Sequence, residues 1–257
     1  MKFNRLKRTL FLLLWIVLPL LTFGNAQQDA LFVKGNNAYA KARYKEALDT
    51  YQKIVSQGYH SAAVYFNMGN ASYKLDDIPS ALLYYEKAHK ISPSDEDINF
   101  NIRFVNSKTV DKIDEVPDFF LSVWFKSVIL SVSANALAIL SLALVLSASA
   151  FLMVYFFAHA TLIKKSSFFT SVILFFLGIL TVFILNRQVG YFEDHRQGII
   201  FGSTVTVKSE PAETSRSLFV IHEGAKVDVL DKNNSWVKVK LANGNEGWMR
   251  QSDLKDI

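Results

Sequence analysis

Residues 66–87 read FNMGNASYKLDDIPSALLYYEK, and residues 32–53 read FVKGNNAYAKARYKEALDTYQK. The two stretches share a Gly-Asn pair and two tyrosines at the same offsets. The identical pairs are Phe32 and Phe66, Gly35 and Gly69, Asn36 and Asn70, Tyr39 and Tyr73, Ala47 and Ala81, Leu48 and Leu82, Tyr51 and Tyr85, and Lys53 and Lys87. This fixed period of 34 residues indicates helical units that stack on one another and bury a continuous core.

The second copy resembles the tetratricopeptide repeat, a pair of antiparallel helices. The resemblance rests on Tyr65, Met68 and Gly69 in a first helix, Ala81, Tyr85 and Ala88 in a second, and Pro93 at its end. Gly69 and Ala81 are small where the helices touch, and Tyr51 and Tyr85 fill the space between layers. The first copy departs from the pattern at Lys34, Ala38, Ile54 and Tyr59.

Two repeats are fewer than such stacks normally need, so another element must cover the second one. Residues 94–105 predict a capping helix, because Ser94 or Asp95 can act as its N-cap. Its apolar stripe consists of Ile98, Ile102 and Val105. We therefore expect two tetratricopeptide repeats and a capping helix over residues 27–108.

The resemblance also implies a concave groove lined by the first helix of each repeat. Its residues would be Phe32, Asn36, Tyr39, Phe66, Asn70, Tyr73 and Lys74. Paired asparagines can hydrogen-bond an extended peptide backbone, and the aromatic rings give the peptide an apolar contact. Alternatively, the asparagines make local hydrogen bonds and the aromatic rings pack within the stack.

The N-terminus has the features of a secretory signal peptide over residues 1–26. Four basic residues (Lys2, Arg5, Lys7 and Arg8) come before an uncharged apolar run from Leu10 to Phe23, and Gly24 and Ala26 suit a signal peptidase. An uncleaved anchor is the alternative. In both cases the sequence that follows is exported.

Two apolar runs predict a transmembrane hairpin, with spans at residues 134–158 and 168–186. The first run gives about 36 Å of helix, enough for a bilayer core of about 30 Å. Lys164 and Lys165 fall in the turn over residues 159–167, which the positive-inside rule places in the cytoplasm. We therefore expect a bacterial inner-membrane protein with both soluble regions in the periplasm.

Residues 109–133 form a linker before the first span. Its aromatic and apolar residues surround one cation, Lys126. They are Phe119, Phe120, Leu121, Trp124 and Phe125. This composition is typical of a segment that lies at the headgroup level of a membrane, although an ordinary juxtamembrane linker is an equal alternative.

The C-terminal residues 190–257 change to short alternating runs, which predict a small antiparallel sheet or barrel. The expected strands are Thr204 to Lys208, Leu218 to Ile221, Lys226 to Leu230 and Ser235 to Leu241, with an Asn243-Gly244 hairpin turn. The order Leu218, Gly224, Val227, Trp236, Val239, Gly244, Gly247-Trp248 and Leu254 resembles the bacterial SH3 fold. Such domains often bind peptides or cell-wall fragments, so Trp248 is either a ligand platform or the core aromatic residue.

Composition and motifs exclude several function classes. The 257 residues carry 28 Lys+Arg, 23 Asp+Glu and no cysteine. The net charge of +5 lies in the N-terminal and membrane-flanking segments, which argues against nucleic-acid binding. The sequence has no phosphate-binding glycine loop, HExxH, GxSxG elbow or dinucleotide fingerprint, so we expect no enzymatic activity, no cofactor and no metal site.

The sequence therefore predicts a multi-domain membrane protein with an α-helical repeat region, a transmembrane hairpin and a small all-β SH3-like barrel. This order resembles the BatE-type proteins of the Bacteroides aerotolerance operon over essentially the whole chain, including the junction at residues 106–120. The resemblance implies a non-enzymatic membrane component that works with von Willebrand factor A domain proteins and a MoxR-type ATPase in envelope stress tolerance.

From the residues alone we expect a scaffold that presents both modules to protein partners. The alternative is a peptidoglycan-binding membrane protein that recruits a wall enzyme.

Overall fold

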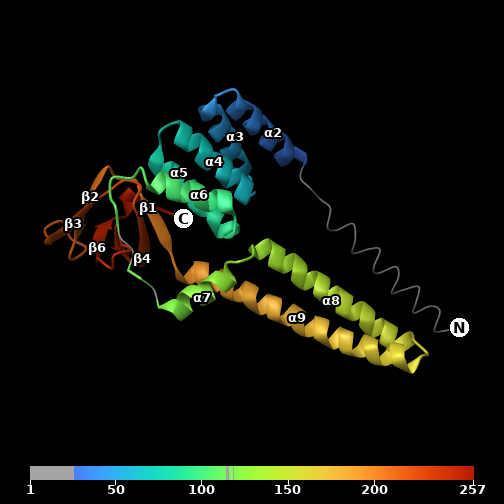
Figure 1. Cartoon of the computed structure of the whole chain (residues 1–257). Coiled ribbons are helices and arrows are strands. Elements are labelled where there is room, and N and C mark those ends of the chain that lie inside the picture. Colours follow the sequence, from blue (N-terminus) through green and yellow to red (C-terminus); the bar gives the residue numbers. More distant parts are fainter. Residues whose placement is uncertain (1–25, 114–115, 118) are drawn as a thin grey trace. The chain divides into compact units, whose positions relative to one another are not determined.

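The computed structural model describes residues 26–113, 116–117 and 119–257. Its contacts divide the chain into two compact units, Met1–Tyr59 and His60–Ile257. Figure 1 shows the helices and strands in chain order. The predicted signal peptide over residues 1–26 lies outside the described residues except for Ala26.

The first unit contains a helix pair, α2 (Ala26–Ala40) and α3 (Tyr44–Ser56). Tyr51 packs against Gly35 so closely that a Cβ added to this glycine would lie 2.4 Å from the tyrosine ring. The turn between the helices passes through Ala42, whose φ is +56°. The Gln28 side chain donates a hydrogen bond to Gln57 at 3.0 Å and so joins the start of α2 to the end of α3.

The second unit begins with another helix pair, α4 (Ala62–Lys74) and α5 (Ile78–Ile91). Ser61 caps α4 by accepting a bond from the Val64 amide, and Asp77 caps α5 by accepting one from Ser80. The turn again has a residue at positive φ, Asp76 at +60°. It lies 34 residues after Ala42, so the backbone repeats with the same period as the sequence.

Helix α6 (Glu96–Asn106) follows the second pair and packs on α5. Of the two predicted N-caps, Asp95 accepts the bonds, from the backbone amides of Asp97 at 3.1 Å and Ile98 at 3.2 Å. Ile98 and Val105 are buried. A helix therefore covers α5 where the sequence predicts one.

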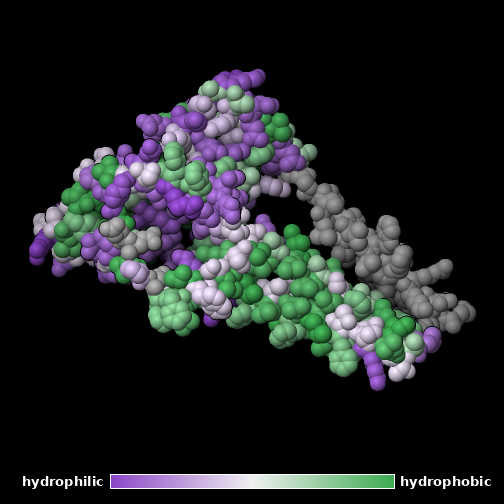
Figure 2. All heavy atoms as spheres, in the orientation of Figure 1, coloured by the Kyte–Doolittle hydropathy of each residue, from purple (hydrophilic) through white to green (hydrophobic). Residues whose placement is uncertain are grey.

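Three further helices follow: α7 (Phe120–Ile129), α8 (Ala134–Phe157) and α9 (Thr161–Asp194). By length and composition, α8 and α9 could each cross a membrane. They pack along each other, and the buried Ser171 hydroxyl donates to the Ala148 carbonyl at 2.8 Å. Figure 2 shows the hydrophobic surface of these two helices.

Helix α9 is longer than the apolar run that predicts it. It begins at Thr161, so Lys164 and Lys165 lie in its first turns and not in the connecting loop, which is shorter than the predicted turn over residues 159–167. It also continues past residue 186 to Asp194. Apolar composition marks only the part suited to lipid, whereas backbone hydrogen bonding extends the helix through polar residues on both sides.

The C-terminal region is one seven-stranded antiparallel sheet with the order β3-β2-β6-β5-β4-β1-β7. Its strands are β1 (Gln197–Ile200), β2 (Thr204–Lys208), β3 (Ser217–His222), β4 (Lys226–Asn233), β5 (Trp236–Lys240), β6 (Glu246–Arg250) and β7 (Leu254–Asp256), with a short 3-10 helix at Gln251–Asp253. The predicted architecture, a helical repeat region with two long apolar helices and a small antiparallel β domain, is confirmed.

Alternating side chains build the core of this sheet. Val237 and Val239 are fully buried, whereas Lys238 between them and Lys240 after them are half-buried. The hairpin between β5 and β6 turns at Asn243-Gly244, where Gly244 has a φ of +88°. Strands β1, β6 and β7 were not predicted, because they are short and lack a clear apolar–polar alternation.

Candidate recognition surfaces

The second repeat holds its predicted groove residues in a fixed local arrangement. The Tyr85 hydroxyl donates to the Asn70 side-chain oxygen at 2.7 Å. The ring of Phe66 lies 5.7 Å from that of Tyr85, measured between centroids. A Cβ on Gly69 would lie 2.6 Å from the same ring, so only glycine admits this tyrosine.

The first repeat has the same arrangement 34 residues earlier. The Tyr51 hydroxyl donates to Asn36 at 2.7 Å, and the rings of Phe32 and Tyr51 are 6.0 Å apart. Each asparagine oxygen thus accepts a bond from the second helix of its own repeat. The local hydrogen bonds that the sequence left as an alternative are therefore present, and peptide binding stays a prediction.

The remaining groove candidates differ in their surroundings. Tyr39 lies 5.2 Å from the ring of Tyr44 in its own repeat. Tyr73 makes an edge contact with Phe104 of α6 at 5.5 Å, so the capping helix supports it. Lys74 ends α4 and is exposed. It is therefore the groove candidate best placed to meet a ligand charge.

Trp248 of β6 lies between two lysines on neighbouring strands. The sheet register pairs it with Lys208 of β2 on one side and with Lys238 of β5 on the other. Its side chain is half-buried and lies outside the buried core cluster of the domain. The register thus puts a basic residue next to Trp248 on each neighbouring strand, an arrangement that suits a ligand that carries carboxylates.

Acidic residues form ion pairs with Lys208, Lys238 and the nearby Arg250. Glu246 bonds Lys238 at 3.0 Å, and this hydrogen bond lowers the pKa of the Glu246 carboxyl. Glu213 binds Arg250 and Lys208, and the Arg250 bond is the main cause of its lowered pKa. Both carboxylates are solvent-exposed, so these pairs are weak and a ligand carboxylate can compete for the cations.

Trp236 of β5 is more buried than Trp248. Its side chain is only 7% exposed. The Arg250 guanidinium lies 4.5 Å from the centre of its ring and covers it. Trp236 therefore serves the packing of the domain, and Trp248 is the more accessible tryptophan on this sheet.

The helical repeat and the β domain of the second unit meet at a junction that the sequence did not predict. Glu86 of α5 bonds the Lys226 ammonium of β4 at 2.7 Å. The Glu86 side chain is 6% exposed and that of Lys226 is 33% exposed, so the carboxylate is largely removed from water. Asp111 of the linker accepts bonds from the His222 backbone amide and pairs with its ring nitrogen at 2.9 Å.

Apolar side chains surround these polar contacts. Ile199 of β1 is fully buried in the cluster formed by α5 and α6, where it joins Leu82 and Val105. Its neighbour Ile200 belongs to the core of the sheet. Strand β1 is thus buried on both faces, which explains why its sequence has no alternating pattern.

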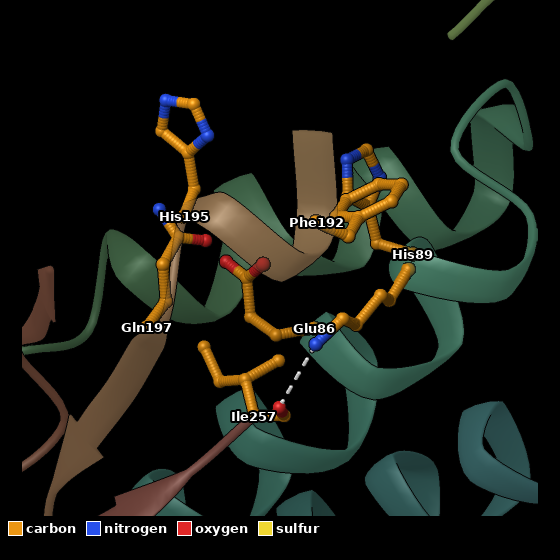
Figure 3. Close-up of a pocket in the computed structure, with 7 residues that line it drawn as sticks. Glu86, His89, Phe192, His195, Gln197 and Ile257 are labelled. Atoms are coloured by element: carbon orange, nitrogen blue, oxygen red, sulfur yellow. Dashed lines mark hydrogen bonds between the residues drawn. The ribbon is translucent and has the colours of Figure 1, made fainter. Parts of the chain in front are cut away.

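A small pocket opens beside the junction, between α5, the end of α9 and β1. Glu86, His89, Phe192, His195, Gln197 and Ile257 line it in Figure 3, together with Lys90. The dashed line marks the bond from the Lys90 ammonium to the Ile257 backbone oxygen at 3.3 Å.

His89 carries the main electrostatic feature of this pocket. Burial lowers its pKa, although the nearby Glu86 carboxylate acts in the opposite direction. Its Nδ1 is buried without a hydrogen-bond partner in the part of the chain that the structure describes. The neutral ring is therefore the favoured form.

Two signals in the sequence could have indicated the junction. Helix α5 has three consecutive apolar residues, Ala81 to Leu83, and all are buried, which requires neighbours on more than one side. The pair Ile199-Ile200 likewise indicates a strand with two covered faces. Neither signal identifies the surface that packs against α5 or β1.

Within the described ranges, no three His, Asp or Glu residues form a group that could hold a metal ion.

Comparisons with known proteins agree with both modules. The tetratricopeptide repeat model matches residues 62–95. The bacterial SH3 domain model matches residues 203–255. The second helix pair is therefore a tetratricopeptide repeat, and the sheet carries a bacterial SH3 domain.

Comparison with curated proteins gave no match. Among solved structures, the chain is similar to an NlpC/P60 family protein from Bacillus cereus, with 19% identity and a TM-score of 0.21. The similarity covers 28% of this chain and 23% of that one.

Proposed function

We propose that the protein is a non-enzymatic scaffold of the bacterial inner membrane that presents its repeats and its SH3 domain to protein partners in the periplasm. One observation carries the proposal: α9 ends at Asp194 and β1 begins at Gln197. Only two residues separate a helix suited to a membrane from the first strand of the sheet that carries the SH3 domain. The domain in turn packs on the second repeat through Glu86 and Lys226.

The resemblance to BatE-type proteins supports a narrower role within this proposal. It suggests von Willebrand factor A domain proteins and a MoxR-type ATPase system as partners, and envelope stress tolerance as the process. The two recognition modules and the two apolar helices are consistent with that order of parts.

The mechanism would be effective concentration. A partner that contacts the second repeat and the SH3 domain together pays the entropic cost of association once, so weak contacts add. The junction strengthens this effect, because a fixed spacing between two binding surfaces removes the cost of ordering a linker. Neither module needs high affinity on its own.

The test is affinity capture of the tagged full-length protein from its native membrane in mild detergent. The variant Asn36→Asp with Asn70→Asp keeps the oxygens that bond Tyr51 and Tyr85, and replaces the amide donors by negative charge. We expect the wild type to bring down von Willebrand factor A domain proteins and the variant to lose them.

The control is the double variant Asn37→Asp with Asn106→Asp, which changes two exposed asparagines outside the predicted groove. This variant has the same added charge and should retain the partners. Equal recovery from all three proteins would refute peptide recognition by the asparagines. Absence of any partner from the wild type would refute the scaffold.

A second candidate function is peptidoglycan binding, because Trp248 lies between Lys208 and Lys238. In this case the SH3 domain holds the wall and the repeats recruit a wall enzyme. Sedimentation of the purified full-length protein with insoluble peptidoglycan tests it. Trp248→Ala should abolish co-sedimentation, and Trp248→Phe should retain most of it. Failure of the wild type to sediment would reject this function.

A further inference from the structure

Helix α7 has an apolar surface that the chain leaves largely exposed. Ile129 is the one residue of the helix that is buried. The exposed fraction is 69% for Phe120 and 64% for Trp124. The other exposed apolar residues of the segment are Phe119, Leu121, Val123, Phe125 and Val128. A surface of this kind marks an interaction site, because a water-exposed helix normally buries its apolar side chains.

Hydrogen bonds fix the C-terminal end of α7 to α9. Gln188 of α9 is 1% exposed, and its amide donates to the Ile129 carbonyl at 3.2 Å and to the Val132 carbonyl at 2.9 Å. The Lys126 ammonium lies 5.5 Å above the ring of Tyr191. These contacts set the level of α7 along α9.

That level can be compared with the thickness of a bilayer. The uncharged run of α9 ends at Asn186, and Arg187 is the next residue. At about 1.5 Å per residue, Gln188 and Tyr191 lie about 3 Å and about 8 Å beyond Asn186 along the helix. Each headgroup layer is about 5–7 Å thick outside the hydrocarbon core. The attached end of α7 therefore falls within the headgroup layer.

We propose that α7 lies in the boundary between the headgroups and the acyl chains of the membrane that α8 and α9 cross. Phe120, Trp124 and Phe125 would enter the acyl region, and Lys126 would face the headgroups. Exposed apolar residues continue along α9 to Val189, beside the Gln188 that holds α7, so one lipid surface can cover both helices. The composition fits, because aromatic residues favour this layer. The inference rests on the proposed membrane insertion.

Tryptophan fluorescence in vesicles tests the position of α7. In the full-length protein, Trp15→Phe, Trp236→Phe and Trp248→Phe leave Trp124 as the one emitter. A matched protein keeps Trp248 in place of Trp124. Both are reconstituted into phosphatidylcholine vesicles that carry bromine either near the headgroup or deep in the acyl chain.

We expect shallow bromine to reduce Trp124 emission by roughly twofold or more, and deep bromine to reduce it less, since an interfacial helix is buried about 5–10 Å. The Trp248 emission should be unchanged by bromine and quenched by iodide in the buffer. Strong quenching of Trp124 by iodide would overturn the inference. Protection from iodide without bromine quenching would mean that protein covers α7, and it would overturn the inference as well.

Flotation of the vesicles separates this inference from the proposed function. Protein that floats with the vesicles while Trp124 stays accessible to iodide keeps the proposed membrane scaffold and rejects the role of α7. Protein that remains at the bottom of the gradient rejects both.

Discussion

Glu86 and Lys226 form an ion pair at 2.7 Å although they lie 140 positions apart in the chain. One comes from the tetratricopeptide repeat and the other from the SH3 domain. The pair therefore joins two modules that are usually considered as independent binding units, and its removal tests whether they act as one body.

Lys226→Met should destabilise the second unit by about 3 kcal/mol, because it leaves the buried Glu86 carboxylate without its partner. The double variant with Glu86→Gln should recover most of this loss. Urea unfolding of the full-length protein in detergent, followed by tryptophan fluorescence, gives the free energies. Lys232→Met is the matched control, because its partner Asp256 is 65% exposed, and it should cost less than about 1 kcal/mol. An equal effect of both substitutions would contradict the buried role of Glu86.

Gly69→Ala should destabilise the second repeat by about 1–3 kcal/mol, because the added methyl group would overlap the Tyr85 ring. Gly190→Ala in α9 is the control, since its Cβ would meet nothing within 4 Å. That exchange should be neutral or stabilise the helix by about 0.5–1 kcal/mol. Thermal unfolding followed by circular dichroism distinguishes the two. A stable Gly69→Ala protein would show that Tyr85 can move away.

Ala42→Gly should stabilise the first repeat by about 0.5–1 kcal/mol, because Ala42 has a φ of +56°, where an L residue with a Cβ is strained. Ala30→Gly, at an exposed position inside α2, should lower stability by about 1 kcal/mol. The unfolding midpoints of the two variants should therefore shift in opposite directions. A decrease in both would mean that the turn carries no strain.

The stability of the second unit should depend on pH through His89. Burial lowers the pKa of His89 below its ordinary value of 6.5, so the unfolded chain takes up the proton first. The contribution of His89 to the stability of the folded state is complete above pH 6.5. It is lost as the pH falls through the folded-state pKa of His89. Urea midpoints measured across this range should decrease toward acid.

One substitution tests the contribution of His89. His89→Gln should flatten the acidic part of the profile relative to the wild type. Identical profiles for the wild type and His89→Gln would show that His89 does not contribute to the pH dependence.

Local patterns predicted the modules because each signal lies within a short stretch of chain. Gly69 and Tyr85 recur at the offset of Gly35 and Tyr51, and the structure gives them the same contacts. Asp95 caps α6 because an N-cap requires only its own next turn. These features depend on neighbours that the sequence itself brings close.

The junction depends on distant residues, which is why the sequence did not predict it. No local pattern pairs Glu86 with Lys226, and charged residues usually indicate a solvated face. The asparagines illustrate the same limit, because Asn36 and Asn70 are compatible with ligand contacts and with bonds to tyrosine. Only the placement of the second helix reveals those bonds.

The short passage from α9 to β1 has a mechanical consequence. The His195 amide still bonds the Tyr191 carbonyl of the helix, and the Arg196 carbonyl already accepts a bond from the sheet at Val229. No freely rotating hinge separates the two elements. A helix of 34 residues joined in this way acts as a lever arm. In the proposed membrane-bound form, a change in the tilt of α9 with bilayer thickness would therefore turn the sheet as well.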